Sequence, residues 1–345
     1  MLVKCREINP EEYSEWDKLV KSVPEGTIYQ TTYWAEYIKK KEDTKPILVV
    51  AEDEKGCLLG SLLAHEDKCF RKLLRYGLLG GFLFYLVNRK RIIITWRYGP
   101  IIYDKSNFET VFDLLLKKIE EIARKRKVIF IKDVSYPIHG DTVYFEKAPG
   151  LFLKRGFSQY DRATIFVNLD KDAIDIWQGF KNSARKAIRK TQGEGIDVRK
   201  IGKLSLDAYG ILLKESRLRL GVELPPVYPD REMLDILGTE RDILEIFAAY
   251  KNNNLCGAIG ILNFNGIVFE TGPAQSRYAF SNKVYVSDIL KWHFIQRVRD
   301  AGCRLYDLCG ISPNPRNEKE KNLNQFKEKW GGSYIKYSAF TKSMI

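Results

Sequence analysis

The sequence DILEIFAAYKNNNLCGAIGILNF (242–264) predicts two antiparallel strands joined by a tight turn, because two apolar runs flank three consecutive asparagines. The dipeptide Asn265-Gly266 favours a second tight turn before the strand IVFETG (267–272). The segment VYVSDILKWHFIQRVRDAG (284–302) is a long helix that closes on a glycine, and RLYDL (304–308) is the strand after it. This order predicts a mixed α/β sheet with helices packed on it.

The first half of the chain repeats the same order. PILVVAED (46–53) and CLLGSLLAHE (57–66) predict a hairpin. NFETVFDLLLKKIEEIARKRK (107–127) predicts an amphipathic helix, which leads to the strand VIFIKD at 128–133. In both halves a glycine turn precedes a terminal strand, at 158–169 and 333–340. The order resembles the Gcn5-related N-acetyltransferase fold, used twice in tandem.

Composition excludes several classes of protein. The chain has 345 residues and a formal net charge of +13, from 57 Lys+Arg against 44 Asp+Glu. Its length predicts two domains, and 45% hydrophobic residues are enough for a core in each. The six cysteines form no C-x-x-C pair and read as reduced cytosolic thiols. No motif of a metal hydrolase, serine hydrolase, P-loop enzyme or Rossmann dehydrogenase is found, and no metal site is expected.

One segment is a candidate for membrane contact. LLRYGLLGGFLFYLV (73–87) is the most apolar run of the chain, and basic residues flank it on both sides. It is too short for a transmembrane helix, and Arg75 and Gly80-Gly81 interrupt it. It is either a strand-turn-strand element in the core or an interfacial patch attracted to anionic lipid.

The segment DAIDIWQGFKNSARKAIRKTQGEGIDV (172–198) predicts a strongly basic helix that Gly193 and Gly195 end. Lys181, Arg185 and Arg189 follow one another at four-residue intervals on one face. Like charges one turn apart repel by a few tenths of a kcal/mol per pair. The helix therefore has either a solvated basic face or a polyanionic partner, such as tRNA or a phosphorylated acceptor.

Four stretches, taken together, resemble the Fem family of aminoacyltransferases, which build peptidoglycan bridges. They are Gln30-Thr31-Thr32-Tyr33-Trp34-Ala35, Arg97-Tyr98-Gly99-Pro100, the basic helix with Gly195-Ile196-Asp197-Val198, and Leu305 to Ile311 followed by Phe326-Lys327. The resemblance implies a first acyltransferase-like domain of residues 1–160 plus 330–345. Residues 161–329 form the second acyltransferase-like domain, with the basic helix and the Phe-Lys motif.

The resemblance also implies the catalytic residues. Lys327 would stabilise the charge that develops when an amine attacks an aminoacyl ester, with Phe326 as its packing neighbour. On sequence alone, the favoured interpretation is that Lys327 is one of several exposed lysines on a short helix, and only the resemblance favours the site. Asp307 either orients the amine and accepts its proton or caps the loop that follows its strand.

Substrate-binding roles follow in the same way for Trp34, Lys39 and Phe269, and for Arg185 and Arg189 on the basic helix. The family's phosphate-binding arginine falls at 221–226, where this chain has none and the nearest arginines are Arg219 and Arg231. The family's aromatic acceptor contacts at 268–272 are reduced here to Phe269, beside the acid Glu270.

We therefore expect a non-ribosomal acyltransferase that moves an aminoacyl group from aminoacyl-tRNA to an amine of a cell-envelope precursor, phosphorylated or lipid-linked. It would be cytoplasmic and need no cofactor, and 73–87 is its candidate contact with the inner membrane face. An acyl-CoA-dependent N-acyltransferase acting on a polysaccharide or lipid-linked amino sugar is the first alternative. It is disfavoured because residues 279–285 contain no glycine for a pyrophosphate loop. A non-catalytic nucleic-acid or membrane-surface module is the second.

Overall fold

The computed structural model describes residues 3–9, 12, 15–69, 91–221, 228–239 and 241–345. The chain divides into two compact units, one of residues 1–161 with 337–345 and one of residues 162–336. We call them unit 1 and unit 2. The apolar segment 73–87 and most of the loop at 221–226 lie outside the described residues.

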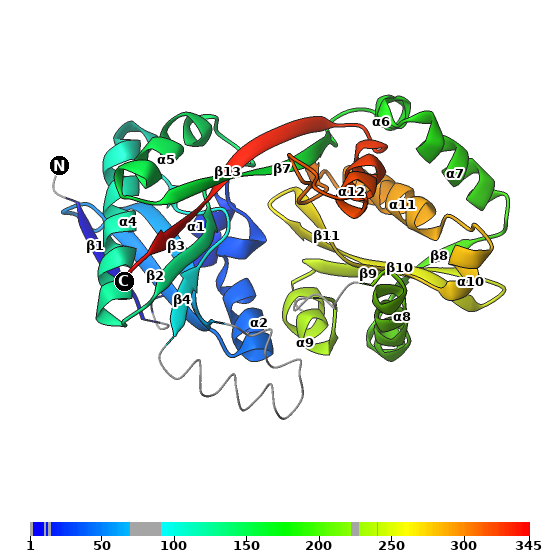
Figure 1. The fold of residues 1–345 in the computed structure, drawn as a ribbon, viewed down its shortest axis with the longest axis horizontal. Coiled ribbons are helices and arrows are strands. Elements are labelled where there is room, and N and C mark those ends of the chain that lie inside the picture. Colours follow the sequence, from blue (N-terminus) through cyan, green and yellow to red (C-terminus); the bar gives the residue numbers. More distant parts are fainter. Residues whose placement is uncertain (1–2, 10–11, 13–14, 70–90, 222–227, 240) are drawn as a thin grey trace. The chain divides into compact units, whose positions relative to one another are not determined.

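Unit 1 combines short strands with helices that cover them (Figure 1). Its main elements are β1 (Lys4–Glu7), α1 (Trp16–Lys21), α2 (Thr32–Glu42), β2 (Lys45–Glu52), β3 (Leu58–Lys68), β4 (Ile92–Thr95), β5 (Ile101–Ile102), α4 (Phe108–Lys125), β6 (Phe130–Ser135), α5 (Val143–Lys154) and the first part of β7 (Ser158–Asn168).

Unit 2 has the second set of strands, with α11 and α8 on opposite faces of its sheet (Figure 1). Its main elements are α6 (Ala173–Gly179), α7 (Asn182–Gln192), β8 (Asp197–Ile201), α8 (Leu206–Arg219), α9 (Arg231–Met233), β9 (Leu244–Lys251), β10 (Asn254–Phe264), β11 (Ile267–Gln275), α10 (Arg277–Ser281), α11 (Val286–Asp300), β12 (Leu305–Asp307), α12 (Glu318–Glu328) and the first part of β13 (Ser333–Ser343).

The two units share one strand topology. The order is β1-β2-β3-β4-β6-β13 in unit 1 and β8-β9-β10-β11-β12-β7 in unit 2. In each, the fourth and fifth strands are parallel and every other neighbouring pair is antiparallel. A long helix, α4 or α11, joins the parallel pair. The predicted mixed α/β fold, with one unit present twice, is confirmed.

The terminal strands differ from a simple repeat. Residues 166–168 of β7 pair with β12 in unit 2, and residues 339–343 of β13 pair with β6 in unit 1. The sequence pattern assigned 158–169 entirely to the first repeat, but the end of this strand completes the second sheet. The sheet of unit 1 therefore takes its last strand from the C-terminal residues of the chain, whereas the sheet of unit 2 takes its last strand from residues at the start of unit 2.

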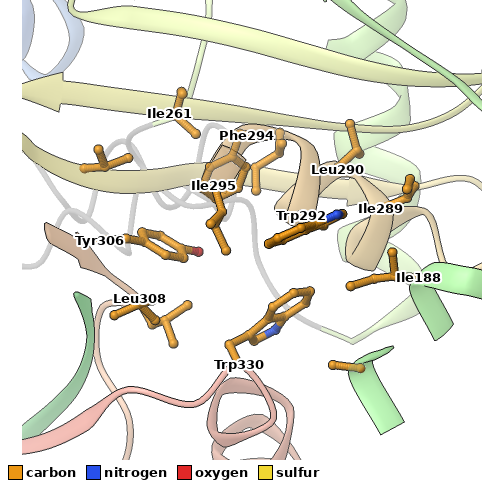
Figure 2. Packing of buried hydrophobic residues seen from close by; sticks show 14 of the residues in the cluster. Ile188, Ile261, Ile289, Leu290, Trp292, Phe294, Ile295, Tyr306, Leu308 and Trp330 are labelled. Atoms are coloured by element: carbon orange, nitrogen blue, oxygen red, sulfur yellow. The ribbon is translucent and has the colours of Figure 1, made fainter. Parts of the chain in front are cut away.

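Both predicted long helices pack by their apolar residues. In α4, Val111, Leu115 and Ile119 are fully buried, as their spacing predicts. In unit 2, α11 contributes to a core that also holds residues of β12 and the end of α12. Figure 2 shows Trp292, Tyr306, Leu308 and Trp330 pointing toward one another in this core.

The prediction of one continuous basic helix from residue 172 to the glycines at 193 and 195 is wrong. The segment forms two helices, α6 and α7, because Phe180 and Lys181 have extended backbone. The Phe180 ring packs edge-to-face on Trp330 at 5.1 Å, and the Lys181 amide donates to the Lys329 carbonyl at 2.9 Å. Tertiary contacts with α12 thus break the helix where its charge pattern continues.

Two glycines end α12 for a steric reason. Gly331 and Gly332 both have positive φ, at 66° and 89°. A Cβ at Gly332 would lie 2.4 Å from the carbonyl oxygen of Phe166 on β7. Only glycine allows both this backbone conformation and this close approach, so the pair fixes the path from α12 into β13.

His65 on β3 makes the stability of unit 1 sensitive to acid. Its side chain is buried, and neither ring nitrogen has a hydrogen-bond partner among the described residues. Burial, together with the Arg97 cation, lowers the pKa of His65 to about 4. The unfolded chain takes up this proton near pH 6.5, so stability is lost as the pH falls from about 6.5 toward about 4.

The free energy of unfolding of the wild type should therefore fall when the pH is lowered from about 7 to about 5. In His65→Leu we expect this fall to be smaller by about 2 kcal/mol. Urea unfolding followed by circular dichroism at both pH values measures this difference. Equal losses in the two proteins would contradict the assignment of His65 as a buried neutral imidazole.

Candidate active site

The Phe326-Lys327 motif lies on α12 (Glu318–Glu328). The sequence LNQFKEKWGG predicts a short helix at 323–332, so the helix begins five residues earlier than predicted. Asn317 caps the helix by accepting from the Glu320 amide at 2.9 Å, and the Asn317 side-chain amide donates to the Glu320 carboxylate at 3.0 Å. This reciprocal pair satisfies polar groups at the start of the helix. It therefore stabilises the start of the helix that carries Lys327.

Lys327 is not an exposed lysine of this helix, because only 9% of the residue is accessible. Its ammonium donates to the carbonyl oxygens of Cys309 and Gly310 at 2.7 and 2.8 Å. These are its two hydrogen bonds within the described residues, and a lysine ammonium has three donors. One N–H is thus available for an oxygen of a substrate.

The loop that receives Lys327 is held from both ends. One turn earlier on α12, Asn324 exchanges two hydrogen bonds with the backbone of Ser312, at 2.7 and 3.0 Å. At the other end, the Asp307 carboxylate accepts from the Cys309 amide at 2.7 Å and from the Thr164 hydroxyl. Asp307 is fully buried, and Cys309 has a positive φ of 55°. The structure thus brings Asp307 and Lys327 to the same loop.

A buried charged cluster lies beside Lys327, and the sequence analysis missed it. The Lys291 ammonium of α11 is paired with the Glu270 carboxylate of β11 and bonds the Tyr306 hydroxyl at 2.9 Å. The Lys291 side chain is 2% exposed and that of Glu270 is 12% exposed. The Tyr306 hydroxyl also donates to Glu270, at 2.5 Å. We call these three residues the charged trio.

The trio and Lys327 shift one another's protonation. Burial raises the pKa of Glu270, but the cations of Lys291 and Lys327 outweigh it and the pKa is lowered. Burial and the Lys291 charge lower the pKa of Lys327, against the opposing effect of Glu270 and Asp307. Burial and the Glu270 charge raise the pKa of Tyr306 well above its ordinary value. The cluster therefore behaves as one electrostatic unit.

Phe326 is half-buried and lies between two cations. The ammonium groups of Lys329 and Lys291 lie 4.3 and 5.6 Å from its ring centre. Lys329 also bonds the carboxylate of Asp288 on α11 at 2.5 Å. The Phe326 ring thus lies close to the ammonium groups of two other lysines of the site.

Lys181, the first basic residue at the start of α7, lies in contact with the end of α12. Besides its backbone bond to Lys329, Lys181 forms an ion pair with Glu328 at 3.1 Å. Arg185 donates to the Gln178 carbonyl at 3.3 Å, and the Arg189 guanidinium lies 5.5 Å from the Trp177 ring centre. Within the described residues neither arginine is paired with a carboxylate. Their charges are therefore available to an anionic partner.

Three backbone amides at the turn before α11 are bonded within the protein. The Val284, Tyr285 and Val286 amides donate to Ala279 O, Thr191 Oγ1 and Val284 O at 2.9, 3.2 and 2.9 Å. A pyrophosphate needs free amides at the start of the helix. These three amides are already used.

In unit 1, a hydrogen bond joins two of the motifs that resemble the Fem family, the one at Gln30 and the one at Arg97. The Gln30 side chain bonds the backbone of Leu63 in both directions, at 2.9 and 3.1 Å, and donates to the Arg97 carbonyl at 2.8 Å. Thr31 caps α2 by accepting from the Trp34 amide. A Cβ at Gly99 would lie 2.9 Å from the Gln30 side chain, so a larger residue there would displace the group that makes these hydrogen bonds. These motif residues position α2.

The remaining predicted binding residues lie in different environments. Trp34 is buried and packs edge-to-face on Tyr29 at 4.8 Å, whereas Lys39 is exposed on α2. Phe269 is fully buried in β11, so its ring has no surface for an acceptor in this conformation. Arg219 at the end of α8 donates to the Gln275 carbonyl at 2.8 Å, and Arg231 is exposed at the start of α9.

Two negative findings concern the part of the chain that the structure describes. No group of three or more His, Cys, Asp or Glu side chains is placed to hold a metal ion. None of the helices there combines the length and apolar character needed to cross a bilayer.

Comparisons with known proteins identify the fold. No family model and no curated protein sequence matches this chain. Among solved structures, FemX has a TM-score of 0.74 at 15% identity, over 98% of this chain and 96% of its own. L-PGS from Bacillus licheniformis has a TM-score of 0.60 at 13% identity, over 98% and 92%. A tandem GNAT protein from the clavulanic acid biosynthesis pathway has a TM-score of 0.57 at 12% identity, over 100% and 99%. The chain therefore has the tandem Gcn5-related N-acetyltransferase-like fold that FemX has.

Proposed function

We propose that this protein is an acyltransferase that forms an amide bond, using aminoacyl-tRNA as donor and an amine of a cell-envelope precursor as acceptor. The observation that carries the proposal is the Lys327 ammonium, which two backbone carbonyls hold in a buried position with one donor unused. The shared fold of FemX and the residues that resemble the Fem family support the choice of substrates.

The chemistry needs alignment and one positive charge. The acceptor nitrogen attacks the ester carbonyl carbon, and a tetrahedral oxyanion forms. The C–O bond to the ribose then breaks, and the proton that the amine loses ends on the ribose oxygen. The unused N–H of Lys327 would stabilise the oxyanion, and a donor of this kind contributes about 3 kcal/mol. Asp307 is committed to Thr164 and Cys309, so we assign it to positioning the loop.

The acyl-CoA-dependent alternative makes a different demand on unit 2. It requires free backbone amides before α11, and those amides are bonded internally. Thermal denaturation separates the two donors, because a ligand that binds the folded state raises the melting temperature. Aminoacyl-tRNA should stabilise the protein and acetyl-CoA should not. The reverse result would favour the alternative.

Arg185 and Arg189 should contact the phosphate backbone of the tRNA. We expect Arg185→Gln/Arg189→Gln to weaken tRNA binding about tenfold at low salt and to reduce the slope of log K against log salt by about 1 to 2. The product formed at saturating tRNA should change little. Filter binding across a salt series measures this, with Lys117→Gln/Lys125→Gln on α4 as a control of equal charge. If the two double variants bind alike, α7 is not the tRNA surface.

The proposed reaction is tested by incubating the protein with a panel of charged tRNAs and candidate amines. Mass spectrometry should find a new amide that contains the amino acid of the tRNA. Transfer from acyl-CoA alone would replace the proposed donor. Absence of any amide across the panel, with tRNA binding intact, would favour the non-catalytic nucleic-acid module.

A further inference from the structure

The charged trio Glu270, Lys291 and Tyr306 is expensive to bury. The Lys291 ammonium has almost no contact with solvent, and its ion pair with Glu270 joins α11 to β11. Removing charges from water costs several kcal/mol per ion, and well-packed apolar residues in place of a buried ion pair are often at least as stable. The trio therefore calls for an explanation other than stability alone.

Its position next to the proposed catalytic lysine supplies one. Lys291 lies against the rings of Phe326 and Trp330, at 5.6 and 5.4 Å, on either side of Lys327 in the sequence. Tyr306 directly precedes Asp307, which holds the loop that binds Lys327. The trio thus lies next to α12 and next to the loop that follows β12, and these two elements position Lys327.

We propose that Glu270 and Lys291 are positioning residues that set the charge of Lys327 in opposite directions. Glu270 favours the protonated ammonium, and Lys291 opposes it. This inference rests on the proposed function in one respect: Lys327 must be protonated to stabilise an oxyanion.

Every charged group that faces Lys327 enters this balance. Glu270 comes from β11, Lys291 from α11, and Asp307 and Cys309 from β12 and its loop. Burial and the Lys291 charge lower the pKa of Lys327, whereas Cys309, Glu270 and Asp307 raise it. Asp307 is already bonded to Thr164 and Cys309, so substituting it would disturb the loop. Substituting Glu270 or Lys291 changes the charge around Lys327 with less damage to the loop.

One carboxylate oxygen strengthens the argument. Both Lys291 and Tyr306 bond to Oε2 of Glu270. Within the described residues, no donor bonds to Oε1. The carboxylate is therefore anchored to Lys291 and Tyr306 through one oxygen, which fixes its charge beside them.

The test follows the titration of Lys327 directly by NMR of the full chain labelled with carbon-13 at lysine Cε. Absence of one signal in Lys327→Arg assigns the resonance. Lys291→Met should raise the titration midpoint of Lys327 by about one pH unit, and Glu270→Gln should lower it by about one. The double variant Glu270→Gln/Lys291→Met should return it close to the wild-type value. The surface pair Glu318→Gln/Lys321→Met, on the same helix, is the matched control and should leave it unchanged.

Shifts of the same sign in the two single variants, or none in either, would overturn the proposal. The double variant keeps the test usable if a single variant fails to fold, because it leaves no unpaired buried charge. In the double variant, Lys327 must then titrate near the wild-type value. The rate of acyl transfer by the double variant must also fall less than the rate of whichever single variant folds. The NMR result needs no donor, so it separates the two hypotheses. Opposite shifts in the two single variants would support this inference. If Lys327→Met in addition has no effect on amide formation, the proposed function is wrong while this inference holds.

Discussion

Lys327→Met should lower kcat/KM for amide formation about 100-fold or more, with little change in the affinity for tRNA. The substitution keeps the length of the side chain and removes its charge and its three donors. A preorganised donor in a water-poor site contributes about 3 kcal/mol to stabilisation of the transition state. Single-turnover transfer with preformed aminoacyl-tRNA measures this loss without interference from product release.

Two controls separate chemistry from structure in this experiment. Asn324→Ala removes another anchor of the same loop but no charge, and it should retain activity within about tenfold. Lys319→Met removes an exposed charge from the same helix and should have no effect. If Asn324→Ala loses as much activity as Lys327→Met, Lys327 acts by holding the loop and the catalytic role fails.

Trp330→Ala should lower the free energy of unfolding of unit 2 by about 3–5 kcal/mol. Trp330 is fully buried and packs against Phe180, and it lies among the core residues of unit 2 shown in Figure 2. Its loss leaves a cavity between α12 and the break from α6 to α7. Hydrogen exchange should report it as faster exchange of the Lys181 amide, which bonds to the Lys329 carbonyl.

Trp330→Phe is the matched variant. It keeps an aromatic ring and removes the Nε1–H group, which is buried without a partner among the described residues. An unsatisfied buried donor costs about 1–3 kcal/mol, so part of the lost packing is offset and the net cost should be well below that of Trp330→Ala. Equal stability of Trp330→Ala and the wild type would contradict the packing of α12 described above.

The architecture could be predicted because its signals are local. Alternating apolar runs and turn dipeptides such as Asn265-Gly266 mark the hairpins, and the repeated order of elements identifies two copies of one unit. The exchange of β7 and β13 between the sheets is a long-range pairing and leaves no local signal. The helices α5 and α8 were also missed. In α8 exposed Ile211 and Leu218 lie among the buried residues, so no clean apolar stripe marks it.

The candidate site was predicted only in part. Resemblance located Phe326-Lys327, but burial of Lys327 depends on the loop that follows β12. Lys291 was missed because its partner Glu270 lies 21 residues away on another element. A signal was present: Asp288 and Lys291 lie among apolar residues in the first two turns of α11, and charges that are buried there require partners. The break at Phe180 was missed for the same reason, since Trp330 and Lys329 cause it from far along the chain.

The central claim is that Lys327 lies beside the reactive carbonyl of the donor. A crystal structure with a stable amide analogue of the aminoacylated 3′ end of tRNA tests it most directly. We predict that the acyl oxygen lies about 3 Å from Lys327 Nζ and takes its unused hydrogen bond, while the carbonyls of Cys309 and Gly310 keep theirs. An analogue bound with its acyl group remote from Lys327, or bound at the start of α11 instead, would contradict the account.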